Sequence, residues 1–203
     1  MSKLKNVVII GFGKSATTTL DKALASCGYN TFHQNVSLEK TTVPELLACS
    51  YKNSGDPFEQ FREYAPFAIT QMDYTNPSKG LVAWPQLDYE MLEAGYNSSD
   101  DTVYILNYRE PHSLTSSFFR WKNGEFIQRV TDADLPGLRA GVGWNENDVF
   151  QWIHAHYDEC RRRFAGSERF LEVNIHSSNF REIVEDFLSV QFSWWGKENV
   201  NVL

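Results

Sequence analysis

The stretch from Val7 to Leu24, VVIIGFGKSATTTLDKAL, gathers two glycines, a lysine and several hydroxyl groups within a few residues. Free backbone N–H groups at a glycine turn and the positive end of a helix dipole together attract an anion. The lysine adds a mobile positive charge, and the hydroxyls add hydrogen-bond donors. We therefore predict a phosphate-binding loop made of consecutive residues: Gly13, Lys14, Ser15, Ala16, Thr17 and Thr18. The alternative is an ordinary strand-to-helix turn whose hydroxyls only cap the helix.

A strand and a helix are expected to position this loop. Val7 to Ile10 are β-branched without interruption, which is typical of a strand buried on both faces. From about Ser15 to Cys27, apolar residues recur at helix spacing, and Gly28 marks the end of the pattern. The sequence thus predicts a strand over 5–10 and a helix over 15–27.

The nucleotide-triphosphate loop, G-x-x-x-x-G-K-[ST], is the first candidate for this motif. Gly13, Lys14 and Ser15 fit its second half, but the position of its first glycine holds Val8, inside the predicted strand. The loop is therefore too short to wrap a β-phosphate in the usual way. A small kinase that uses ATP is disfavoured on this ground but stays open, as does a nucleotide-binding module without catalysis.

A second phosphate-binding motif is predicted in TVYILNYREPHSLTSSFFRW, Thr102 to Trp121. It indicates a buried strand over 102–108 and a helix over 112–122, with Arg109 at the carboxyl end of the strand, where α/β sheets bind ligands. A guanidinium group grips phosphate oxygens as a two-pronged donor, and Ser117 can project toward the same anion. The alternative is a surface ion pair between Arg109 and a carboxylate such as Glu110.

The two motifs together resemble those of sulfotransferases. GFGKSATTTL is similar to the 5′-phosphosulfate loop of that family, K/R-[ST]-[GA]-T-T-x-L. The family binds a 3′-phosphate with an arginine at a strand end and a serine eight residues later, the spacing of Arg109 and Ser117. A weaker similarity to a bacterial-type branch covers His156 to Ile175.

The resemblance implies a donor, 3′-phosphoadenosine 5′-phosphosulfate, and a product, 3′,5′-adenosine bisphosphate. A hydroxyl or amine of a small-molecule, glycan or lipid acceptor would attack sulfur in line. Negative charge then builds on the oxygen between phosphorus and sulfur, where the ammonium of Lys14 would stabilise it. This scheme requires no metal. The sequence does not name the acceptor.

The general base for the acceptor is less clearly indicated. The T-H-L-P-like segment that carries this histidine in cytosolic animal enzymes is absent. His33, in GYNTFHQN, and Asp73, in ITQMDYTNP, resemble residues of the bacterial-type branch, and we predict them as catalytic candidates. His33 can equally be a half-exposed residue at a strand end. His156 lies on a predicted helix with Arg161 and is expected on a solvated face.

Composition narrows the class of protein. The chain has 203 residues and a net charge of −7, which argues against a nucleic-acid-binding surface. Three cysteines at wide spacing, Cys27, Cys49 and Cys160, fit neither a disulfide framework nor a zinc site, so we expect reduced thiols in a cytoplasm. No apolar run is long enough to span a membrane or to serve as a signal peptide. The oligomeric state stays open.

The order of predicted elements indicates the fold class. Further strands are expected near 31–32, 67–72 and 170–174, and further helices near 43–50, 57–64, 86–94, 147–164 and 179–189. Strands that alternate with helices predict a single α/β domain over 1–203, a three-layer, P-loop-like fold with a parallel sheet between helices. The segment 123–143 shows no clear period and is expected as a mobile loop over the site or a surface excursion.

Overall fold

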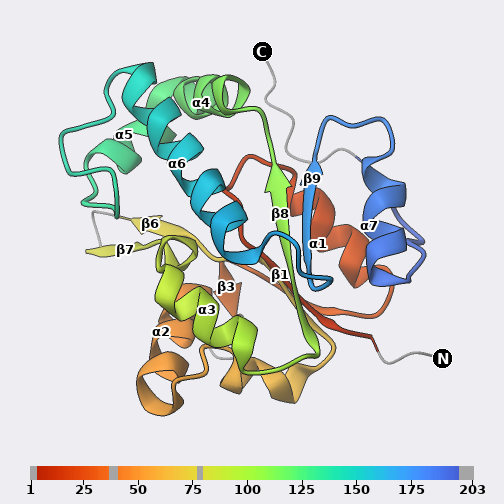
Figure 1. Cartoon of the computed structure of the whole chain (residues 1–203). Coiled ribbons are helices and arrows are strands. Elements are labelled where there is room, and N and C mark those ends of the chain that lie inside the picture. Colours follow the sequence, from red (N-terminus) through yellow and green to blue (C-terminus); the bar gives the residue numbers. More distant parts are fainter. Residues whose placement is uncertain (1–3, 37–40, 77–79, 197–203) are drawn as a thin grey trace.

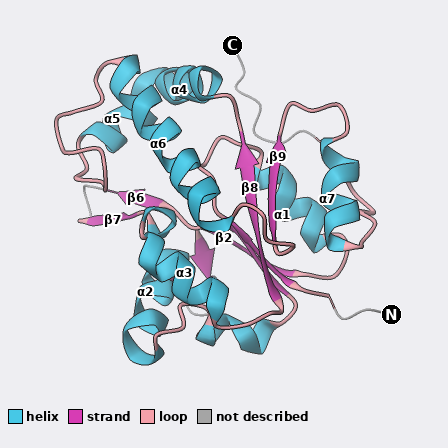
Figure 2. Ribbon diagram, viewed as in Figure 1, coloured by secondary structure: helices cyan, strands magenta, loops and turns pink. Residues whose placement is uncertain are grey.

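The structure is a computed structural model that describes residues 4–36, 41–76 and 80–196. Its centre is a sheet with the strand order β4-β3-β2-β5-β1-β8-β9 (Figures 1 and 2). The parallel part consists of β2 (Asn30–His33), β5 (Phe67–Gln71), β1 (Asn6–Ile9), β8 (Thr102–Tyr108) and β9 (Phe170–Asn174). Two short antiparallel strands, β3 (Asn35–Val36) and β4 (Thr41–Thr42), extend one edge.

Helices cover both faces of this sheet, as predicted. Val7 and Ile9 of β1 pack with α1 (Thr17–Ala25) and α7 (Phe180–Leu188) in one hydrophobic core. Val8 and Ile10 face a larger core on the other side of the sheet. The helices of that side include α2 (Val43–Ser54), α3 (Tyr89–Asn97), α4 (Pro111–Arg120) and α6 (Glu146–Phe164). Because β1 is buried on both faces, its sequence is an uninterrupted apolar run.

Several helices begin at side chains that satisfy their free N–H groups. Thr42 and Glu45 form a reciprocal capping box at the start of α2. The Glu110 carboxylate accepts from the backbone N–H groups of His112 and Ser113 and so fixes the first turn of α4. Glu110 therefore caps the helix that follows Arg109, and the direction in which α4 leaves the sheet is set locally.

Some elements differ from the sequence-based expectation. The residues expected as a helix over 57–64 form a 3-10 turn, η1 (Glu59–Tyr64), and another 3-10 turn, η3 (Pro85–Leu87), precedes α3. A hairpin of β6 (Tyr74–Asn76) and β7 (Leu81–Ala83) had no expected counterpart. It consists of two strands of three residues each, too short for a period to show.

The segment 123–143 is not a continuous loop. A 3-10 turn, η4 (Trp121–Gly124), leads into a helix, α5 (Glu125–Thr131), whose Ile127 and Val130 are buried. The helix has only seven residues, which is fewer than two helical turns. No helical periodicity of apolar residues is therefore visible in the sequence. Within the described part of the chain, no helix is long and apolar enough to cross a membrane.

Candidate functional site

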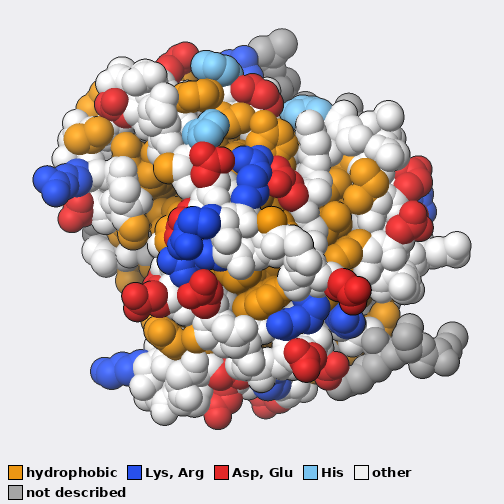
Figure 3. Space-filling view, viewed as in Figure 1, with side chains coloured by type: hydrophobic (Ala, Val, Ile, Leu, Met, Phe, Trp, Pro, Cys, Tyr) orange, Lys and Arg blue, Asp and Glu red, His pale blue; other side chains and the backbone are white. Residues whose placement is uncertain are grey.

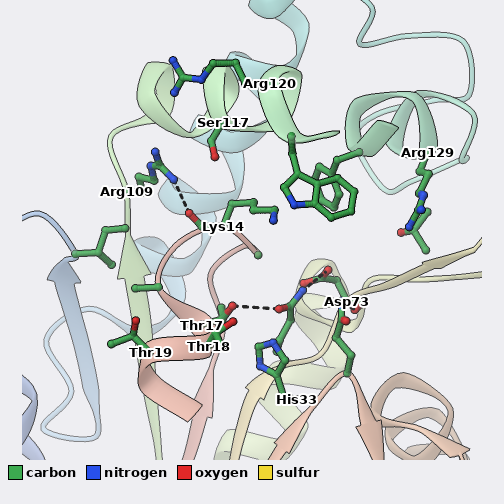
Figure 4. Close-up of a pocket in the computed structure, with 18 of the residues that line it drawn as sticks. Lys14, Thr17, Thr18, Thr19, His33, Asp73, Arg109, Ser117, Arg120 and Arg129 are labelled. Carbon is green, nitrogen blue, oxygen red and sulfur yellow. Dashed lines mark hydrogen bonds between the residues drawn. The ribbon is translucent and has the colours of Figure 1, made fainter. Parts of the chain in front are cut away.

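A cavity of about 570 Å³ lies at the carboxyl ends of the central strands, where the two predicted motifs meet (Figure 4). It brings together residues that are far apart in the sequence. The predicted site residues that line it are Gly13, Lys14, Ala16, Thr17, Thr18, His33, Asp73, Arg109 and Ser117. Ser15 lies beneath this lining and is fully buried. The volume is in the range of about 300–1,000 Å³ that small-molecule sites occupy.

The loop of the first motif has an unusual backbone. Lys14 and Ala16 both take left-handed φ values, 66° and 60°, although neither is glycine. Such residues persist only where the surroundings fix them, and they cluster at functional sites. The Asn107 side chain of β8 supplies part of that support, because its Nδ2 donates to the Ser15 carbonyl oxygen over 2.6 Å. A Cβ at Gly11 would collide with the same Asn107 side chain, so glycine is required there.

Arg109 joins the two motifs physically. Its Nη1 donates to the backbone carbonyl oxygen of Lys14 over 2.6 Å, and the side chain is half-buried. Its Nε is buried and has no hydrogen-bond partner among the described residues. Burial lowers the pKa of Arg109, and the positive charge of Arg120 lowers it further. Ser117 lies beside it on α4, 2% exposed, and lines the same cavity.

The Lys14 side chain extends across the cavity toward Trp121 (Figure 4). Burial lowers the pKa of Lys14 to about 8, and the carboxylate of Asp73 partly opposes this shift. The charges of Lys122 and Arg109 also lower it. The ammonium is therefore held at a point where an added negative charge would be strongly favoured.

Asp73 is connected to the loop through amide side chains. Thr17 donates from Oγ1 to Gln71 Oε1 over 3.1 Å, and Gln71 Nε2 donates to Asp73 Oδ2 over 3.0 Å (Figure 4). Gln86 Nε2 donates to the other carboxylate oxygen over 3.3 Å. Asp73 is 2% exposed, and burial raises its pKa. A carboxylate with a raised pKa is a stronger base than one in water.

His33 is fixed by a polar chain that reaches α1. Its Nδ1 lies 3.1 Å from Thr70 Oγ1, and the Thr70 hydroxyl lies 2.9 Å from Asp21 Oδ1 and 3.2 Å from a carbonyl oxygen. The Thr70 proton goes to one of those two acceptors, so the hydrogen-bond network assigns the Nδ1 proton to the neutral His33 ring. Nε2 is then its basic nitrogen. Burial lowers the pKa of His33 and keeps the ring neutral near pH 7.

Several further lining residues were not found from the sequence. They come from the residue between β2 and β3, from β5, β6, α4, η4 and α5, and from the segment after β9: Gln34, Gln71, Thr75, Arg120, Trp121, Phe126, Arg129, Ile175 and His176. Only His176 had a usable signal, because it follows the end of a predicted strand. The cavity is strongly cationic although the chain carries a net charge of −7. Among the described residues that line the cavity, Lys14, Arg109, Arg120 and Arg129 are accompanied by one carboxylate, Asp73, and Arg129 is also paired with Glu125 outside the lining.

His156 is not on a solvated face, and that expectation was wrong. The side chain is 1% exposed; its Nε2 lies 2.8 Å from the Ile10 carbonyl oxygen, and the Tyr89 hydroxyl lies 3.1 Å from its Nδ1. Burial lowers its pKa to about 4, so the ring is neutral and donates to Ile10, the residue before the loop. His156 falls on the apolar stripe of α6 with Ile153 and Cys160, at helix spacing.

The charged side of α6 lies elsewhere on that helix. Arg161 pairs with Asp158 and Glu172, and Arg163 pairs with Glu159. Figure 3 shows basic and acidic side chains next to one another on the face that α6 covers. Five positions along a helix amount to about 140° of rotation beyond a full turn, so Arg161 does not share a face with His156.

Comparisons with known proteins bear on the fold. Neither the family models nor the curated protein sequences contain a match to this chain. The structure is similar to the sulfotransferase domain from the Synechococcus PCC 7002 olefin synthase, with a TM-score of 0.51 and 16% sequence identity. The similarity covers 95% of this chain and 76% of that domain. At this level of identity the likeness establishes a sulfotransferase-type α/β fold.

Proposed function

We propose that this protein transfers a sulfuryl group from 3′-phosphoadenosine 5′-phosphosulfate to a hydroxyl or amine of an acceptor. The observation that carries the proposal is the 2.6 Å hydrogen bond from Arg109 Nη1 to the Lys14 carbonyl oxygen. It joins the two motifs that are predicted to bind anions, which follow different strands, at one cavity. The likeness of the fold to a sulfotransferase domain supports the same function.

The cavity residues fit a nucleotide with phosphates at both ends. At the loop, the Thr18 hydroxyl and the N-terminus of α1 suit the 5′-phosphosulfate, and the Thr17 hydroxyl could join them if it exchanged its hydrogen bond to Gln71 for one to the ligand. At the other end, the buried Nε of Arg109 offers a donor that no described residue uses. A buried donor without an acceptor costs free energy, which a phosphate oxygen would recover. Ser117 supplies a hydroxyl at the same end.

In this scheme Lys14 carries the largest catalytic effect. The donor supplies an activated sulfuryl group, and breaking its link to phosphate leaves negative charge on the bridging oxygen. The Lys14 ammonium meets that charge in a half-buried position, where water screens it less than in bulk solvent. The hydrogen bond from Arg109 fixes the loop backbone at Lys14, so only the side chain of Lys14 has to move to bring its ammonium to the bridging oxygen.

Asp73 and His33 are the two candidates for the acceptor's proton. Asp73 has the raised pKa and a polar link to Thr17 of the loop through Gln71, whereas His33 offers Nε2. The four cationic side chains around the cavity disfavour a protonated amine, so the acceptor would react as a hydroxyl or a neutral amine. Single-turnover rates of Asp73→Asn and His33→Gln distinguish the two candidates, because only substitution of the residue that acts as the general base should lower the rate of sulfuryl transfer.

Ligand binding tests the proposed function without knowledge of the acceptor. Calorimetry would compare adenosine 3′,5′-bisphosphate, 5′-AMP and ATP, each with and without Mg²⁺. We expect the bisphosphate to bind about tenfold to a hundredfold more tightly than 5′-AMP without metal, since charge-assisted contacts contribute about 1.5–3 kcal/mol. Equal affinity for the two nucleotides contradicts the proposal. Tight binding of ATP that depends on Mg²⁺ would instead favour the kinase alternative.

We also propose a cellular compartment for the protein. Cys27, Cys49 and Cys160 are all free thiols in the structure, which supports a reducing compartment such as the cytoplasm. The acceptor class, whether small molecule, glycan or lipid, and the state of association are left to experiment.

A further inference from the structure

Arg120 ends α4 and lines the same cavity as Arg109 and Ser117. It follows Ser117 by three positions, so the two residues lie on neighbouring turns of one side of the helix. Figure 4 shows Arg109, Ser117 and Arg120 at one end of the cavity and Arg129 at the other. A second guanidinium group is thus available at the end of the cavity that Arg109 and Ser117 line.

Among the described residues, neither Arg109 nor Arg120 forms an ion pair, although the carboxylate of Glu110 lies near enough to Arg109 to favour its charged form. Arg120 is exposed and has no hydrogen bond or ion pair among the described residues, whereas Arg129 pairs with Glu125. The charge of Arg120 also disfavours the charged form of Arg109, in addition to the effect of burial. The two guanidinium groups repel each other, and the carboxylate of Glu110 offsets this effect on Arg109 by less than Arg120 contributes to it. A dianion between the two groups would remove the repulsion.

We propose that Arg120 is a specificity-determining residue that grips the 3′-phosphate of the nucleotide together with Arg109. The inference rests on the proposed function, because it takes the ligand to be a nucleotide with a 3′-phosphate. In this arrangement Arg109 reaches the phosphate from the end of β8, Ser117 from the middle of α4, and Arg120 from its last turn. Arg120 discriminates between a 3′,5′-bisphosphate and a 5′-monophosphate because it contacts only the 3′-phosphate. The 5′ end of the ligand is bound by the loop after β1.

Arg120 also has a purely structural alternative. A basic residue in the last turn of a helix interacts favourably with the negative end of the helix dipole. That role affects the stability of α4 whether or not a nucleotide is bound, and it does not distinguish one nucleotide from another. Nucleotide selectivity is therefore the readout that separates the two roles.

The test measures the affinity of adenosine 3′,5′-bisphosphate and of 5′-AMP for the parent, Arg120→Gln and Arg120→Lys. Arg129→Gln is the matched control, because it removes one positive charge from the opposite end of the same cavity. We expect Arg120→Gln to weaken bisphosphate binding about tenfold and to leave 5′-AMP binding unchanged, since one charge-assisted contact is lost. Arg120→Lys should recover part of the loss, and Arg129→Gln should preserve the selectivity. Thermal melting of each variant without ligand reports the structural role.

The outcomes separate the inference from the function on which it rests. If the parent prefers the bisphosphate and Arg120→Gln keeps that preference in full, the proposed contact of Arg120 with the 3′-phosphate is contradicted. The proposed function is not affected by that result. An equal loss for both nucleotides, or a matching loss in Arg129→Gln, also overturns the role, because it indicates a general field effect. If the parent itself shows no preference, the proposed function fails and this inference fails with it.

Discussion

The ammonium nitrogen of Lys14 lies 4.4 Å from the centroid of the Trp121 ring. The two residues come from different parts of the fold, the loop after β1 and the turn after α4. Lys122 Nζ lies 4.6 Å from the centroid of the same ring. A cation near an aromatic face gains about 0.5–2 kcal/mol, depending on how far water is excluded. Trp121 therefore holds the Lys14 ammonium out in the cavity, away from the loop's own backbone.

The lowered pKa of Lys14 predicts a pH dependence of ligand binding. The ammonium of the free protein titrates near pH 8, and a bound bisphosphate would raise that pKa by its negative charge. Bisphosphate affinity should therefore fall as pH rises from 7 to 9, by about tenfold. Binding near pH 8.5 should take up a proton, measurable by calorimetry in two buffers with different ionisation heats. Lys14→Met is the control, and an unchanged affinity of the parent from pH 7 to 9 contradicts the prediction.

Lys14 should matter more for turnover than for binding. Its charge is needed most when the bridging oxygen becomes anionic, and Lys14→Met keeps much of the side-chain length while it removes that charge. We expect sulfuryl transfer at saturating donor to fall by about a hundredfold or more, with a smaller loss in bisphosphate affinity. The measurements are single-turnover transfer, once an acceptor is found, and calorimetry. A variant that turns over at the parent rate would show that leaving-group stabilisation comes from elsewhere.

The geometry of Arg109 predicts that lysine cannot replace it. Arg109→Lys keeps a positive charge but loses the planar fork that can serve the Lys14 carbonyl oxygen and a phosphate at once. Bisphosphate affinity should drop by about tenfold, and 5′-AMP affinity should change less. Arg129→Lys in the same cavity is the control and should bind both nucleotides like the parent. An Arg109→Lys variant with parent affinity would remove the bidentate role.

His156 should make the fold sensitive to mild acid. Its folded-state pKa of about 4 lies below the usual 6.5, so the unfolded chain binds the proton more readily between these values. The free energy of unfolding should therefore fall as pH is lowered from 6.5 to 4, by up to about 3 kcal/mol from this residue. His156→Gln keeps an N–H donor for the Ile10 carbonyl oxygen but does not titrate. Urea unfolding of both proteins should give curves that converge toward pH 4; parallel curves would contradict the assignment.

The sequence by itself determined the elements that carry a continuous or periodic apolar signal. The strands predicted over 102–108 and 170–174 have the bounds of β8 and β9. β8 is buried between two helical layers, so its apolar run is long. β9 is an edge strand in which only Val173 is buried, and its apolar signal is shorter. The two predicted anion-binding motifs were also recognised in the sequence, since glycines, hydroxyls and cations close together at a strand end are typical of a phosphate-binding loop. The roles assigned to their residues stay predictions.

The tertiary structure decided what the cavity contains besides these motifs. His156 reaches Ile10 across 146 positions, and Arg109 reaches Lys14 across 95. Helix α5 has only seven residues, yet it brings Phe126 and Arg129 to the cavity. Local patterns report only whether a residue faces the core or the solvent. Which charged and aromatic side chains share one cavity depends on how strand ends far apart in the chain meet at one edge of the sheet, and packing alone fixes that meeting.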